Sequence, residues 1–273
     1  MDWRHSRWIL AAVLASLTWV GALAGADEPN FTEEQKIDFL QHAKVIDSKP
    51  EKKGKSNALH LTLTDGKVTY DASFQPIDEK KMEGPAPGGG IELNFRDYWG
   101  YDIAGYRIAK LLGLDDMVPV YTERSWNGAT GAISWRIPNV QFDEADRYQQ
   151  NIHPPDVDVF NKQMYKVRVL TQLFYDMDPN LTNVLIDKDW KIWRIDFTRA
   201  FRLQHDLKDP KDLVQCDRQV LAKLRQLSFD QVLDATKPYL TKNEVKALMA
   251  RRDKMVTYFD ALVAQKGEGQ VLY

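Results

Sequence analysis

The chain has 273 residues, of which 44% are hydrophobic and 28% are charged, and its 37 basic and 39 acidic side chains give a formal net charge of −2. This composition is typical of a folded globular protein and excludes a disordered chain, a collagen-like repeat and a small disulfide scaffold. Because generic nucleic-acid binders usually carry a basic excess, the charge balance also argues against a nucleic-acid partner.

Residues 1–26 predict an export signal peptide. Arg4 and Arg7 precede an apolar run over Trp8–Val20, and two small-residue cleavage sequences follow, ending at Ala24 and at Ala26. An uncleaved membrane anchor is the alternative, but the run is shorter than the roughly 20 apolar residues that a membrane span needs. We therefore expect a periplasmic or secreted protein with no stable membrane span after cleavage.

The cysteines and histidines of the sequence argue against an internal disulfide and against a zinc site. Cys216 is the only cysteine, so the chain can form no internal disulfide. The five histidines are scattered and show neither a HExxH motif nor a nucleophile-elbow context. A zinc site is therefore not expected.

The first half of the exported chain predicts a helix followed by strands. The helical spacing over Glu33–Lys44 begins at a possible capping box made by Thr32 and Gln35. A charged loop is expected over Lys49–Lys55. Two alternating runs, residues 58–63 and 68–74, flank an Asp-Gly pair, which is a strong hairpin signal.

The rest of the first half predicts a loop, a helix and two strands. The loop covers Asp78–Gly90, and its three terminal glycines lack the pattern of a Walker phosphate loop. The helix covers Asp97–Leu112 and should end at Gly113. The strands cover 117–123 and 131–137.

The second half is predicted to be mainly helical. A long amphipathic helix over Val159–Tyr175 is followed by a short hairpin, with strands at 184–186 and 190–195. Further helices are expected over 212–226, 228–236 and 241–264. A β-rich half followed by a helical half with one embedded hairpin predicts an α+β fold of two lobes, 27–137 and 138–273, with a cleft between them.

The polar residues around the embedded hairpin point to metal-dependent chemistry. Asp178 and Asn183 precede the first strand of the hairpin, and Asp196 follows the second strand, so the hairpin should bring Asn183 and Asp196 side by side. Two oxygen-bearing side chains placed in this way can share one Mg²⁺. A further carboxylate can accept a proton from an attacking hydroxyl, which is the arrangement that phosphoryl transfer needs.

The same segment resembles the protein-kinase-like fold in its atypical branch. The sequences DMDPNLTN and WRIDFTRAF have the order and spacing found in phosphatidylinositol kinases, HipA-like toxin kinases and secretory-pathway casein kinases. The upstream sequence LLGLDDMVPVYTER resembles the helix and strand of their first lobe. The resemblance covers about residues 56–202 and is specific over 176–201.

The resemblance implies a role for each of these residues. Asp178 would be the catalytic residue, and Asn183 and Asp196 would hold Mg²⁺ or Mn²⁺. ATP or another nucleotide would lie between the first-lobe sheet and the hairpin, near Ile137–Val140. The acceptor of the phosphoryl group, whether protein, lipid, sugar or small molecule, is not indicated.

Two positions depart from the family pattern. The strand over residues 68–75 should end in a phosphate-binding lysine, and it ends in Gln75. The helix should offer a glutamate to pair with that lysine, and the best candidate is Asp102. Lys80, Lys81 or Arg96 could supply the missing charge. Gly54–Asn57 is only a weak substitute for a glycine-rich phosphate loop.

These departures leave two alternatives to an active kinase. The first is a pseudokinase that binds a nucleotide or a partner protein without catalysis. The second is a calcium-binding module, because oxygen-bearing side chains fall at positions 1, 3, 5, 7 and 12 of a calcium loop: Asp176, Asp178, Asn180, Thr182 and Asp187. Against calcium, position 6 is a leucine where such loops need glycine, and position 12 is an aspartate where glutamate is usual.

Overall fold

The computed structural model describes residues 28–51, 58–86 and 89–273. The signal peptide predicted over residues 1–26 and the weak phosphate-loop candidate Gly54–Asn57 lie outside these ranges. Across the described ranges, every helix is too short or too polar to cross a bilayer.

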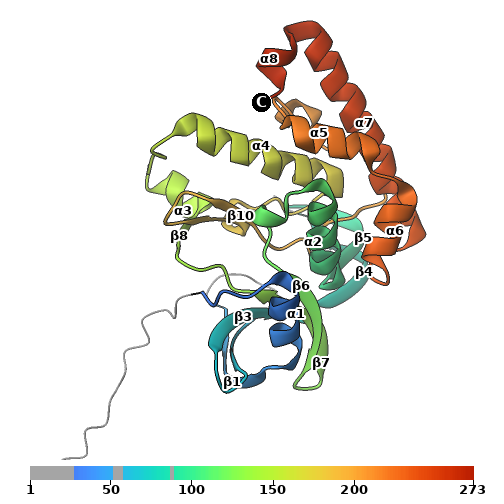
Figure 1. Cartoon of the computed structure of the whole chain (residues 1–273). Helices are drawn as coiled ribbons and strands as arrows, with labels where there is room; N and C mark the ends of the chain where they lie inside the picture. The colour runs from blue at the N-terminus through green and yellow to red at the C-terminus, as the bar shows by residue number, and fades with distance from the viewer. Residues whose placement is uncertain (1–27, 52–57, 87–88) are drawn as a thin grey trace, which may run out of the picture.

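A five-stranded antiparallel sheet forms the lower lobe in Figure 1. Its strands lie in the order β1-β2-β3-β7-β6. The bounds are β1 (Lys44–Pro50), β2 (Leu59–Thr64), β3 (Thr69–Gln75), β6 (Tyr121–Trp126) and β7 (Ala129–Trp135). Helix α1 (Glu33–His42) packs Phe39 and Leu40 against this sheet. Together with side chains of the sheet they form a buried apolar cluster, separate from that of the helical lobe.

Local signals that the sequence predicted are present in this lobe. Thr32 and Gln35 form the expected reciprocal capping box at the start of α1. In the β2–β3 turn, the Asp65 carboxylate accepts hydrogen bonds from the N–H groups of Lys67 and Val68, both at 2.8 Å. Gly66 has φ +90°, the left-handed region that favours glycine.

The second lobe is mainly helical and contains the predicted hairpin. The helices are α3 (Glu144–Gln149), α4 (Val157–Phe174), α5 (Arg218–Gln226), α6 (Phe229–Thr236), α7 (Lys242–Lys266) and α8 (Glu268–Val271). The hairpin strands β9 (Val184–Asp187) and β10 (Ile192–Arg194) pair as expected, and β8 (Val140–Asp143), which was not predicted, adds to the β9 edge. The chain also contains the short 3₁₀ helices η1 (Asp115–Met117), η2 (Leu181–Asn183) and η3 (Pro210–Asp212).

Helix α2 (Gly100–Leu112) connects the two lobes. It ends, as predicted, at Gly113, which has φ +68°. Its buried side chains belong to the large apolar cluster that also contains α4, α5 and α7. The Tyr101 hydroxyl donates to Glu244 of α7, and Arg107 donates to the carbonyl of Ala235 in α6 at 3.0 Å. The helix is therefore fixed to the helical lobe as well as to the sheet.

The prediction of a loop over Asp78–Gly90 is wrong. Residues Asp78–Pro85 form strand β4, which pairs with β5 (Ile91–Tyr98) in a separate two-stranded ribbon, here called the arm. The expected helix accordingly starts at Gly100 instead of Asp97. The sequence of β4, DEKKMEGP, contains no β-branched or aromatic residue, so pairing with β5 overrides its weak strand propensity. The loop predicted over Lys49–Lys55 also begins too early, since β1 extends to Pro50.

Candidate functional site

The candidate site is a cleft of about 610 Å³ between the sheet and the β9–β10 hairpin. Its lining includes four of the five residues singled out in the sequence: Gln75, Asp102, Asn183 and Asp196. Its apolar lining includes Ile137, Leu185 and Ile195. The structure therefore brings together side chains that lie more than 100 residues apart in the chain.

The open end of the hairpin places Asn183 beside the segment of Asp196, as the spacing predicted. The N–H of Ile195 donates to the carbonyl of Asn183 at 3.0 Å, which closes the hairpin one residue before Asp196. Asn183 lies in the η2 turn directly before β9. Asn183 and Asp196 both belong to the lining of the cleft.

Asp196 is held in a conformation that few non-glycine residues adopt. Its φ is +61°, in the left-handed region, which costs about 1–3 kcal/mol and is typical of functional sites. Its Oδ1 accepts hydrogen bonds from the Thr198 hydroxyl at 2.8 Å and from the Thr198 N–H at 3.2 Å. Thr198 therefore orients the carboxylate through Oδ1, while Oδ2 receives no hydrogen bond from the described residues.

Asp102 holds the backbone that follows Asp196. Its Oδ1 accepts a hydrogen bond of 2.6 Å from the N–H of Phe197, and the side chain is buried. Burial raises the pKa of the Asp102 carboxyl well above its usual value, and the neighbouring Asp196 raises it further. The sequence suggested Asp102 as the partner of a phosphate-binding cation, whereas its observed contact is with the main chain.

Gln75 lines the cleft at the end of β3, and its Oε1 accepts a hydrogen bond from the N–H of Ile77 at 3.1 Å. The three substitutes considered for the missing lysine lie on the arm and do not line the cleft. Lys81 pairs there with Glu79 at 2.6 Å, and Arg96 pairs with Asp78.

The basic side chains in the cleft lining come instead from the sheet and its linker: Lys49, His60 and Arg136. Arg136 pairs with Glu51 at 2.7 Å, and His60 lies 3.0 Å from Asp71. Two of these three basic side chains, Arg136 and His60, therefore already lie beside a carboxylate. The register Lys49–His60–Ser73 across three strands could not be read from the sequence without knowing the strand order.

Asp178 lies on the loop that enters η2, partly buried and outside the residues that line the cleft. Its N–H donates to the carboxylate of Asp176 at 3.0 Å, and its carbonyl accepts from the N–H of Asn180 at 2.7 Å. The N–H of Met177 donates to the carbonyl of Arg199 at 3.1 Å, which joins this loop to the segment after Asp196.

A buried ion pair that the sequence did not reveal anchors the Asp178 loop. The carboxylate of Asp176 contacts the guanidinium of Arg194, and the two side chains are only 2% and 1% exposed. Burial raises the pKa of the Asp176 carboxyl, and the charge of Arg194 opposes that rise. Arg194 also donates to the carbonyl of Asp196 at 3.2 Å, so one side chain contacts both the Asp178 loop and the segment of Asp196.

The same contacts argue against the calcium loop. Asp176 is occupied by Arg194, and Asp187 accepts hydrogen bonds within its own turn from the N–H groups of Asp189 and Lys191. Among the described residues, there is also no group of three or more carboxylate, histidine or cysteine side chains that could hold a metal ion. The side chains at positions 1 and 12 of the calcium-loop alternative are therefore both engaged in contacts within the protein.

The oxygen donors of Asn183 and Asp196 fit a small divalent cation that keeps other ligands. Mg²⁺ prefers hard oxygen ligands and is commonly bound through one or two carboxylates together with substrate phosphates. A carboxylate residue and an amide residue that both line the cleft match that kind of site.

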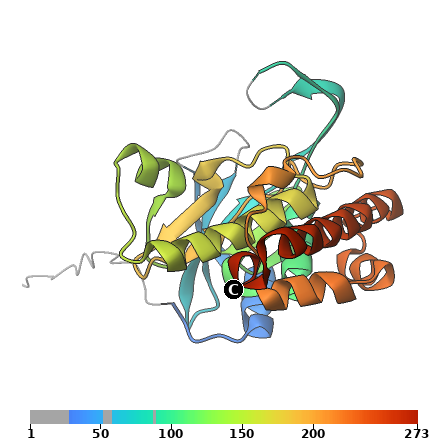
Figure 2. The ribbon, with the colours of Figure 1, turned by 90° about the horizontal axis from the view of Figure 1, so that it is seen from above.

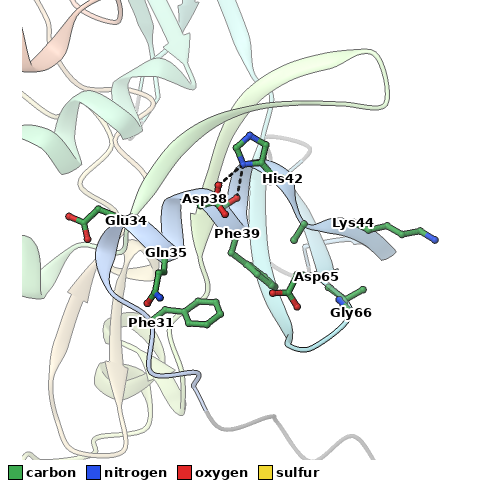
Figure 3. Close-up of a pocket in the computed structure, with 11 residues that line it drawn as sticks. Phe31, Glu34, Gln35, Asp38, Phe39, His42, Lys44, Asp65 and Gly66 are labelled. Carbon is green, nitrogen blue, oxygen red and sulfur yellow. Dashed lines mark hydrogen bonds and ion pairs between the residues drawn. The ribbon is translucent and has the colours of Figure 1, made fainter.

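A second hollow, of about 910 Å³, lies between α1 and the β2–β3 turn (Figure 3). It shares no lining residue with the cleft. His42 and Asp38 in this hollow contact each other at 3.0 Å on the exposed side of α1. None of the predicted site residues lies there.

Comparisons with known proteins identify the fold. No family model and no curated protein sequence match the chain. Solved structures do match: hydra Fam20 with sugar has a TM-score of 0.63 at 13% identity, covering 88% of this chain and 92% of the other. The Golgi casein kinase with Mn/ADP bound has a TM-score of 0.60 at 11% identity, covering 88% and 78%. The Helicobacter pylori proinflammatory kinase CtkA has a TM-score of 0.51 at 10% identity, covering 84% and 98%.

These similarities show that the chain has an atypical protein-kinase-like fold, with a β-rich N-terminal sheet and a helical C-terminal part, as the sequence predicted. At 10–13% identity they establish the fold and not the activity.

Proposed function

We propose that the protein is an exported atypical kinase that transfers a phosphoryl group from ATP, or another nucleotide, to an acceptor hydroxyl. The observation that supports this most directly is the shared cleft, in which Asn183 and Asp196 lie opposite the cleft-facing surface of the N-terminal sheet. A neighbour of the same fold is described with Mn/ADP bound, which agrees with a nucleotide and a divalent metal.

In this proposal Asn183 and Asp196 would hold Mg²⁺ or Mn²⁺, which would supply positive charge for the phosphates. Asp178 orients the acceptor hydroxyl and receives its proton. Phosphoryl transfer depends mainly on such positioning and on electrostatic stabilisation of the transferred group. Thr198 and Arg194 keep Asp196 in place through the hydrogen bonds described above.

Thermal unfolding of the full chain with ATP, and with Mg²⁺ or Mn²⁺, tests the nucleotide site. We expect the unfolding midpoint to rise only when nucleotide and metal are present together, because a ligand that binds the folded state stabilises it. The rise should disappear in Asp196→Asn and persist in Asp189→Asn, a matched change in the exposed hairpin turn. An equal rise in wild type and Asp196→Asn would reject Asp196 as a metal ligand.

The second candidate is a pseudokinase, and Gln75 is the observation that favours it. A neutral amide at this position cannot supply the ammonium charge that the resemblance leads one to expect beside the phosphates. Phosphate release or transfer from labelled ATP separates the two functions. Turnover that is lost in Asp178→Asn supports the kinase, whereas metal-dependent binding without turnover supports the pseudokinase.

A further inference from the structure

The arm carries an exposed apolar surface that the cleft does not use. Met82 of β4 is 82% exposed, and Ile91 and Leu93 of β5 are each 68% exposed. In Figure 2 the ribbon of β4 and β5 extends away from the rest of the molecule. Exposed apolar side chains grouped on one element are typical of interaction sites.

The far half of the arm is fixed to the segment that follows Asp196. Glu92 is buried between two arginines, contacting Arg199 directly and Arg202 at 2.7 Å. The Arg199 guanidinium also lies over the ring of Phe95, 4.3 Å from its centre. These contacts hold the exposed surface in a defined position relative to the cleft.

The backbone of β5 explains why one side of the arm is buried and the other is open. Asn94 has φ +56°, which interrupts the alternation of side chains along the strand. As a result Glu92 and Phe95 are both buried on the side of Arg199, while Ile91 and Leu93 are exposed.

Arg199 also brings the arm close to the Asp178 loop. Its carbonyl accepts the N–H of Met177 at 3.1 Å, and its guanidinium donates to the carbonyl of Pro85 in β4 at 3.1 Å. One residue therefore contacts both the loop of Asp178 and the far half of the arm.

We propose that the arm docks the acceptor, and that the acceptor is a polypeptide with an extended segment carrying apolar side chains. The arm is a sheet of two strands, and β4 has no strand neighbour on its outer edge in the described structure. The outer edge of β5 is occupied by residues 198–202 at Tyr98, whose N–H donates to the carbonyl of Thr198, and at Arg96, whose carbonyl accepts from Arg202. A further strand can pair on the edge of β4, or on the edge of β5 at Ile91–Leu93. An extended peptide supplies both the main-chain partners for that edge and the apolar side chains for Met82, Ile91 and Leu93. This inference rests on the proposed function, because the reaction defines the acceptor.

A library of 12-residue peptides, probed with the full chain, tests the docking surface. Peptides with alternating apolar side chains should bind wild type and lose about tenfold or more in affinity for the double variant Ile91→Ser, Leu93→Ser. Met82→Ser tests the other strand independently. The matched control is Ile46→Ser, because Ile46 is 52% exposed on β1, outside the arm.

The outcomes separate the docking surface from the proposed function. The variants should keep the unfolding midpoint of wild type and its rise with nucleotide and metal, since these side chains are exposed and outside the cleft. No peptide binding above background, or equal binding by the double variant, overturns the inference. A dimer in sedimentation velocity that the double variant abolishes also overturns it, by assigning the surface to a second copy. Arm-dependent peptide binding without any nucleotide effect would leave a peptide-binding surface and reject the kinase.

Discussion

At the scale of single residues, Asp102 was expected to pair with a phosphate-binding cation, and its observed contact is with the main chain. It accepts the N–H of Phe197 inside the protein, so its removal leaves a buried donor without a partner. We expect Asp102→Ala to lower the free energy of unfolding by about 1–3 kcal/mol. Asp102→Asn retains a carbonyl acceptor and should lose less. Urea unfolding measures both, with the exposed Asp38→Ala as control, and equal losses in the two Asp102 variants would contradict the assigned contact.

The raised pKa of Asp102 gives a second prediction with a defined sign. Because the pKa is higher in the folded than in the unfolded protein, the folded state binds more protons, and the stability that Asp102 contributes decreases as pH rises above its ordinary pKa of 3.8. Asn does not titrate, so the stability difference between Asp102→Asn and wild type should shift in favour of the variant as pH rises from about 4 toward neutrality. Urea unfolding across this range tests it. A constant difference between the two proteins would show that Asp102 keeps an ordinary pKa.

The buried pair of Asp176 and Arg194 should behave differently from the surface ion pairs. Removing one partner leaves an uncompensated buried charge, which costs about 3–5 kcal/mol, so Arg194→Met should be strongly destabilising. The double change Asp176→Leu, Arg194→Met removes both charges and should recover part of the loss. Arg225→Met, which breaks the exposed pair with Asp260, should cost about 1 kcal/mol or less. A double variant no more stable than Arg194→Met would show that the other contacts of Arg194 dominate.

At the scale of elements, the features with local signals were predictable from the sequence. The capping box of α1, the Asp-Gly turn between β2 and β3 and the glycine that ends α2 are each specified within a few residues, and all three are present. The adjacency of Asn183 and Asp196 was predictable for the same reason, since one short hairpin connects them. The contact of Asp102 with Phe197 joins positions 95 residues apart, and no pattern in the sequence reports it.

The sequence did not predict the arm, because its strands depend on pairing with each other and not on a local sequence pattern. Strand β4 is rich in charge, contains no β-branched residue and buries none of its side chains, so it shows no apolar alternation. Strand β8 was missed because four residues are too short a run to show a periodicity. Both strands are specified by pairing with a partner strand and not by their own sequence.

Gly84 gives a test of how the arm is held. A Cβ at this position would lie 2.2 Å from Cδ2 of Phe95, so Gly84→Ala must displace the ring that packs under Arg199. We expect faster amide exchange along β4 and β5 and a loss of about 1–3 kcal/mol. Gly269→Ala is the matched control, because nothing lies within 4 Å of its added Cβ. Unchanged exchange in Gly84→Ala would mean that Phe95 can move without loosening the arm.

At the scale of the whole molecule, the cleft combines apolar residues, the two residues proposed as metal ligands and few unpaired basic side chains. The sheet and the helical lobe each have their own apolar cluster, and the buried side chains of α2 belong to the cluster of the helical lobe. The chemistry of the cleft then depends on which charges line it. Of the basic side chains there, Arg136 and His60 already lie beside carboxylates, and the end of β3 offers the neutral Gln75.

Restoring a cation at this position tests whether the cleft is organised for phosphates. Gln75→Lys places an ammonium group at the end of β3, where it can contact phosphates bound by way of Asn183 and Asp196. A hydrogen bond to a charged group contributes about 1.5–3 kcal/mol, so nucleotide affinity should rise about tenfold to a hundredfold. Calorimetric titration with ATP and Mn²⁺ measures this, and Gln149→Lys, on the exposed end of α3, controls for net charge. If wild type binds nucleotide and Gln75→Lys binds no more tightly, the phosphates lie elsewhere in the cleft and Gln75 is not a lost phosphate contact. If the affinity rises and phosphoryl transfer rises with it, the neutral side chain at position 75 is what limits this protein as a kinase.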